Sequence, residues 1–128
     1  MIPLLLFASA LSVEDFGALD QAIDKCDRGA VTPTFASDQS RRSAFMTAAY
    51  AEEAAIVGAR ADLRARQALL RAGKPMAGDN DRALANASAA LDDRQKSLDD
   101  QRTLEALRVE AIDVKRRYYL AKCASGKD

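Results

Sequence analysis

Histidine and tryptophan are absent from this chain of 128 residues, and phenylalanine and tyrosine make up only 5% of it. Without histidine, the chain lacks the commonest general base and the commonest transition-metal ligand. The 19 basic and 19 acidic residues cancel, so the chain also lacks the positive excess of a dedicated nucleic-acid binder. We therefore predict a protein that is not an enzyme, carries no metal or cofactor and binds no nucleic acid.

Valine and isoleucine are scarce, whereas alanine, leucine and charged residues are common. This composition favours long helices over a sheet. The length fits one domain, and we expect a single helical domain over residues 11–128. The internal prolines, Pro33 and Pro75, separate three segments. The expected helices cover residues 12–28, 37–72 and 80–123.

Apolar residues recur every seven positions in the second and third segments, as in helices that pack like coiled coils. In the third segment the repeat is Leu84, Leu91 and Leu98, and in the second segment Glu52 and Arg66 interrupt it. We predict an all-α fold, an antiparallel hairpin of two long helices with coiled-coil-like packing. The short first helix should pack at the open end of this hairpin.

The third segment carries two apolar stripes from residue 104 onward. We expect the second helix to cover one stripe and the first helix to cover the other. The first stripe consists of Leu104, Leu107, Ala111, Val114, Tyr118 and Ala121. The second stripe consists of Val109, Ile112, Tyr119 and Cys123.

The only two cysteines are Cys26 and Cys123, and each ends an apolar stripe. Their matching positions predict two buried sulfur atoms joined by a disulfide. Such a bond is typical of an oxidising compartment. If the chain stays in the cytoplasm instead, both residues are free thiols.

The apolar stretch at residues 1–10 ends in Ala8-Ser9-Ala10, which has the small residues preferred at a signal-peptidase site. We predict that it is a short or truncated export signal and that the protein is periplasmic or secreted. The stretch is too short to span a bilayer, so we predict no stable membrane insertion. The alternative is an uncut apolar arm on a cytoplasmic protein.

Two groups of residues are candidate contact sites. Near the open end of the hairpin, a basic cluster is a candidate patch for an anion or a partner. The alternative is internal pairing of these residues, in part with the acidic first helix. At the turn between the long helices, Lys74 and Met76 are a candidate tip contact. The basic cluster consists of Arg41, Arg42, Lys115, Arg116 and Arg117.

These features predict a non-enzymatic exported protein that acts as a binding, scaffold or chaperone-like module through helix-mediated protein contacts. Its partner would be another protein or a second copy bound through the hairpin. One alternative is an inhibitor or accessory subunit of an envelope enzyme that uses the tip. Another is a cytosolic coiled-coil regulator.

Overall fold

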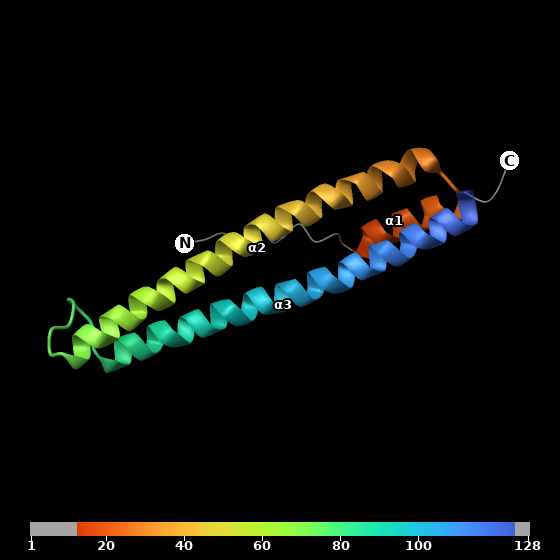
Figure 1. Cartoon of the computed structure of the whole chain (residues 1–128). Helices are drawn as coiled ribbons and strands as arrows, with labels where there is room; N and C mark the ends of the chain where they lie inside the picture. The colour runs from red at the N-terminus through yellow and green to blue at the C-terminus, as the bar shows by residue number, and fades with distance from the viewer. Residues whose placement is uncertain (1–12, 125–128) are drawn as a thin grey trace. The chain divides into compact units, whose positions relative to one another are not determined.

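The computed structural model describes residues 13–124, so the export signal predicted at residues 1–10 lies outside the described residues. Within this range the chain is all-α (Figure 1). It divides into two compact units. Of the described residues, unit 1 contains those up to Ala48 and from Thr103 onward, and unit 2 is Ala49–Arg102. The elements are the helices α1 (Val13–Asp24), α2 (Arg28–Arg71) and α3 (Asp81–Tyr119), followed by the π-helix η2 (Leu120–Ala124).

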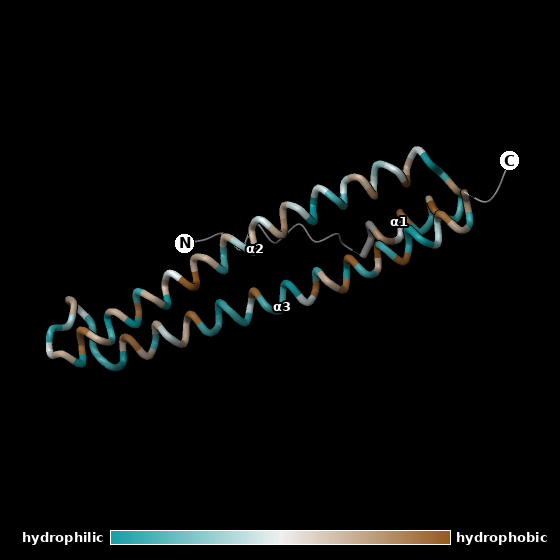
Figure 2. The backbone as a smooth tube through the Cα atoms, in the orientation of Figure 1, coloured by the Kyte–Doolittle hydropathy of each residue, from teal (hydrophilic) through white to brown (hydrophobic). Residues whose placement is uncertain are grey.

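The predicted fold class is confirmed, because α2 and α3 run antiparallel and the short α1 packs beside the C-terminal part of α3 in unit 1 (Figure 1). Along α2 and α3, apolar residues alternate with polar ones (Figure 2). Among the helices of residues 13–124, none combines the length and the apolar character needed to cross a membrane.

A tight junction joins α1 to α2. Cys26 has a φ of 49° and takes the left-handed position that usually follows a helix. Its N–H donates to the carbonyl of Ile23, and the N–H of Asp27 donates to the carbonyl of Ala22, which is a Schellman motif. Asp27 also caps α2, because its Oδ1 accepts the N–H of Ala30 at 3.3 Å.

This junction corrects the predicted boundaries of the first two helices. Helix α1 ends at Asp24 rather than near residue 28, and α2 begins at Arg28 rather than near residue 37. Pro33 lies inside α2, and the helix continues through it. The proline removes one backbone hydrogen bond of the helix, the bond to the carbonyl of Gly29.

In unit 1, three helices share one apolar core. The buried core joins Leu19 and Ile23 of α1 with Val31 and Phe35 of α2 and Ile112 of α3. Val31 and Phe35 reach this core because α2 continues through Pro33. The core therefore depends on Val31 and Phe35, two residues that the sequence-based prediction left between the first and second helices.

In unit 2, the seven-residue repeat forms the contact between α2 and α3. The predicted repeat Leu84, Leu91 and Leu98 is buried, as are Ile56 and Leu63 of α2. The connection between the helices begins with a second Schellman motif. In this motif the N–H of Gly73, whose φ is 76°, donates to Leu70, and the N–H of Lys74 donates to Leu69.

The start of α3 agrees with the prediction to one residue. Asn80 caps the helix, because its Oδ1 accepts the N–H of Ala83 at 2.8 Å. At the other end the regular α-helix stops at Tyr119, and the π-helix η2 carries Lys122 and Cys123.

Candidate functional site

In unit 1, α3 exposes a row of large apolar side chains. Leu104 is 66% exposed, Leu107 59%, Val114 49% and Tyr118 54%. Together with the half-buried Ala111, these residues follow the alternating three- and four-residue spacing of a coiled-coil seam. We call Leu104, Leu107, Ala111, Val114 and Tyr118 the α3 stripe.

The α3 stripe and the core side of α3 face different directions. At 100° per residue, the stripe lies about 110° around the helix from Ile112 and Tyr119. Ile112 is fully buried in the unit 1 core, and Tyr119 packs against that core. A helix with two apolar faces has one face for its own fold and one for another surface.

The exposure of this stripe corrects the expectation that α1 and α2 would each cover one stripe of α3. Both helices instead pack on the side that carries Ile112. The reason lies in the first turns of α2. Because Val31 and Phe35 are helical and enter the same core as Leu19 and Ile23, the two partners share one face of α3.

A buried charge cluster joins α2 to α3 beside that core, and the sequence analysis did not identify it. The side chain of Asp38 is fully buried, and that of Arg108 is 7% exposed. Arg108 Nη1 lies 2.8 Å from Asp38 Oδ1. The only sign of the cluster in the sequence is that Arg108 stands between Leu107 and Val109. The Asp38 cluster consists of Asp38, Arg41, Arg42, Glu105, Arg108 and Asp113.

The arginines hold Asp38 in its ionised form. Burial raises the pKa of Asp38, but hydrogen bonds and charges from Arg108 and Arg42 outweigh burial and bring that pKa below its ordinary value of 3.8. Nε and Nη2 of Arg108 are buried without a hydrogen-bond acceptor among the described residues. Removal of Asp38 would thus leave a buried guanidinium without its counter-charge.

A cavity of about 550 Å³ lies between α1 and α2 beside this cluster. Among the described residues that line this cavity, Asp38 is the one carboxylate. A carboxylate with a lowered pKa that is held by three arginines is a weak base at neutral pH. The lining of the cavity includes Ala18, Ala22, Pro33, Thr34, Asp38 and Arg108.

Two members of the predicted basic cluster, Arg41 and Arg42, face carboxylates of α3. Arg41 donates two hydrogen bonds to Glu105, at 2.7 and 2.6 Å. Arg42 donates to Asp38 at 2.6 Å and to Asp113 at 2.9 Å. These contacts agree with the alternative of internal pairing.

The three basic residues of α3 in this cluster lie on different sides of the helix. Lys115 donates to Asp20 of α1, and the guanidinium of Arg116 lies 5.0 Å from the centre of the Phe35 ring. Arg117 is exposed. The structure therefore does not gather the five basic residues into one open patch.

At the tip, the candidate contact residues Lys74 and Met76 are both exposed, and Met76 is 54% exposed.

In unit 2, charged residues of α2 pair with residues of opposite charge on α3 and in the connection before it. Arg60 donates to Asp92 at 3.0 Å. The two charged residues that interrupt the α2 repeat also have partners inside unit 2. Arg94 donates two hydrogen bonds to Glu52, and Arg66 donates two to Asp79.

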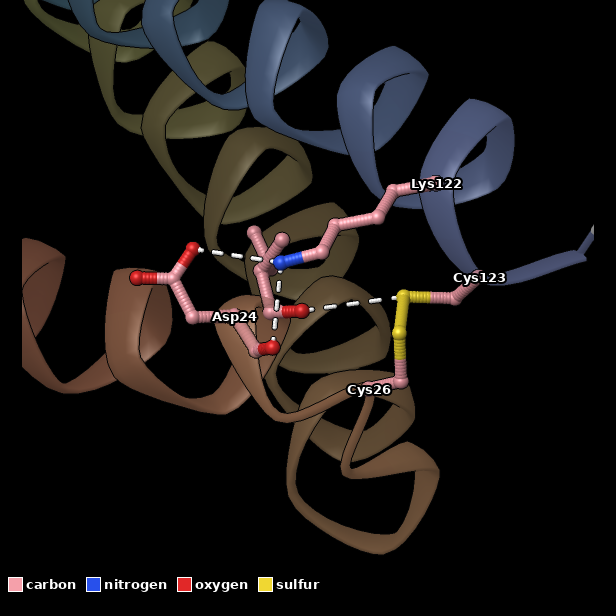
Figure 3. Close-up of a disulfide and its surroundings, with 5 residues drawn as sticks. Asp24, Cys26, Lys122 and Cys123 are labelled. Carbon is pink, nitrogen blue, oxygen red and sulfur yellow. Dashed lines mark hydrogen bonds and ion pairs between the residues drawn. A yellow bond between two sulfur atoms is a disulfide. The ribbon is translucent and has the colours of Figure 1, made fainter. Parts of the chain in front are cut away.

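The predicted disulfide between Cys26 and Cys123 is present, with 5.5 Å between the Cα atoms (Figure 3). Cys26 is exposed and Cys123 is half-buried, so the expectation of two buried sulfur atoms was wrong. The left-handed turn after α1 places Cys26 outside the apolar stripe of that helix. Beside the bond, Lys122 Nζ donates to the carbonyl of Asp24 at 3.0 Å (Figure 3).

Among residues 13–124, no group of three or more acidic, cysteine or histidine residues could hold a metal ion. Searches of protein-family models, curated proteins and solved structures found no match to this chain.

Proposed function

We propose that the chain is a non-enzymatic, exported helical protein that acts through protein contacts made by the α3 stripe. The observation that carries this proposal is the coiled-coil spacing of large, half-exposed apolar side chains on a helix that already packs another face in a core. Covering Leu104, Leu107, Val114 and Tyr118 would contribute about 1 kcal/mol for each side chain before the costs of association.

The disulfide supports the exported part of the proposal, because such bonds persist in oxidising compartments. The test is the intact mass of the native protein from separated cell fractions, measured without reduction. The proposal predicts a chain with the bond intact, two hydrogens lighter than the reduced form, outside the cytoplasm. A reduced chain in the cytoplasm would contradict export.

The contact itself can be tested by photo-cross-linking in the native cells. A benzophenone amino acid at position 107, within the stripe, should cross-link to another protein chain. The same group at Ala106, which is exposed but outside the stripe, is the matched control and should cross-link much less. Equal yields at both positions, or no product at 107, would contradict the proposal.

Cross-linking from a third position distinguishes the proposed function from the alternative, an inhibitor or accessory subunit that uses the tip. Met76 is 54% exposed in the connection between α2 and α3. Cross-linking from position 76 and not from position 107 would favour that alternative. The proposed function predicts the opposite ranking.

A further inference from the structure

The charges beside the α3 stripe differ between its two sides. On one side, the basic residues already face acidic residues of the same chain. On the other side, Glu110 and Arg117 are exposed, opposite in charge and seven residues apart. In a coiled coil these two would occupy equivalent flanking positions, which contact the partner helix. The occupied side carries Arg108 with Asp38, Lys115 with Asp20, and Lys122 with Asp24.

We propose that the α3 stripe binds the α3 stripe of a second copy of this chain in antiparallel orientation. This inference rests on the proposed function and names its partner. In an antiparallel pair centred between Ala111 and Val114, Ala111 lies opposite the partner's Val114. In the same register, Leu107 lies opposite the partner's Tyr118, so larger and smaller side chains alternate across the seam.

Charge complementarity supports this orientation. The antiparallel register brings Glu110 beside the partner's Arg117, and the two-fold symmetry makes this pair twice. A parallel register would instead bring Arg117 beside the partner's Lys122, which is also basic and already faces Asp24 in its own chain. It would also bring Glu110 beside the partner's Lys115, which already donates to Asp20 in its own chain. The exposed flank therefore favours the antiparallel pair.

The test is sedimentation equilibrium of the full chain with charge-reversal variants. Glu110→Arg and Arg117→Glu should each weaken the dimer about tenfold, because each turns both attractive pairs into repulsive ones. The double variant should regain wild-type affinity. An equimolar mixture of the two single variants should form a heterodimer, because each copy then presents the charge that the other needs.

Matched controls carry the same charge changes on exposed positions of α3 in unit 2. Asp93→Arg and Arg82→Glu should leave the dimer affinity within about twofold of wild type. Circular dichroism of every variant checks that the helices are retained.

Four results would overturn the inference. A wild-type chain that stays monomeric at millimolar concentration excludes the second copy. An Arg117→Glu variant that dimerises more tightly than wild type identifies a parallel pair. A double variant whose dimer affinity stays as low as that of the single variants shows that Glu110 and Arg117 do not pair. If the cross-link from position 107 leads to a different protein, this inference fails while the proposed function stands.

Discussion

Cys26 and Cys123 are 97 residues apart in the sequence and are joined by a disulfide. Cys26 lies in the junction after α1, with Lys25 between it and the helix end at Asp24, and Cys123 lies in η2 after α3. The bond therefore ties the junction between α1 and α2 to the end of α3, next to the apolar core of unit 1.

We expect Cys123→Ala to lower the free energy of unfolding by about 3 to 4 kcal/mol, because it opens a loop of nearly 100 residues in the unfolded chain. Urea unfolding followed by circular dichroism measures the change. Reduced wild-type protein is the matched comparison and should unfold at a urea concentration close to that of the variant. Unchanged stability after reduction would contradict a structural role of the bond.

Position 26 combines the disulfide with a left-handed backbone. Cys26→Gly and Cys26→Ala both remove the bond, but only glycine adopts a φ near 49° without a steric penalty. We expect the glycine variant to be about 1 kcal/mol more stable than the alanine variant. Equal urea midpoints for the two variants would contradict the described turn.

The buried Asp38 should be far more sensitive to substitution than a partly exposed member of the same cluster. Asp38→Asn should cost about 3 kcal/mol, because it leaves the buried Arg108 without its counter-charge. Asp113→Asn, at a side chain that is 43% exposed, should cost less than about 1 kcal/mol. Similar losses of unfolding free energy for both variants would contradict the burial of Asp38.

Lowering the pH should reduce the free energy of unfolding, because it protonates the Asp38 carboxylate. The pKa of Asp38 is lowered in the folded protein, so near pH 4 the unfolded chain binds the proton more readily than the folded chain. The stability that the ionised Asp38 contributes to the fold is fully present above about pH 5 and is lost as the pH falls below about 4.

Urea unfolding at constant ionic strength tests this dependence. The difference in unfolding free energy between wild type and Asp38→Asn should shrink as the pH is lowered from 6 to about 3. A difference that stays constant over this range would contradict a lowered pKa for Asp38.

The cap of α3 gives a prediction confined to unit 2. Asn80→Ala removes the acceptor of the Ala83 N–H and should cost about 1 kcal/mol. Asn86→Ala, at an exposed position inside the same helix, is the control and should be neutral or slightly stabilising. Urea midpoints that rank these variants the other way would contradict the capping assignment.

The repeat of Leu84, Leu91 and Leu98 and the two cysteines were enough to predict the antiparallel helices and the disulfide. The position of Pro33 misled the boundary prediction. A proline in the second turn of a helix removes a backbone hydrogen bond, so Pro33 favoured a break in the sequence pattern. The helix instead begins at the cap residue Asp27, and a single capping residue is a weak signal in a sequence.

The sequence did not predict that the α3 stripe is exposed, because the covering surface depends on packing between distant parts of the chain. An apolar stripe on a helix shows which residues avoid water, but it does not tell whether the covering surface comes from the same chain. That answer depended on where Val31 and Phe35 pack. The partner of Arg108, Asp38, lies 70 residues away in the sequence, and a pair of that separation has no local signal.

Carbene footprinting of the α3 stripe, in the native cell fraction and in dilute purified protein, tests whether another protein chain covers the stripe. We expect Leu107 and Tyr118 to be labelled in the dilute protein and protected in the native fraction. Val57, which is exposed in unit 2, should be labelled equally in both samples. Equal labelling of Leu107 and Tyr118 in the two samples would contradict the claim that another protein chain covers the stripe.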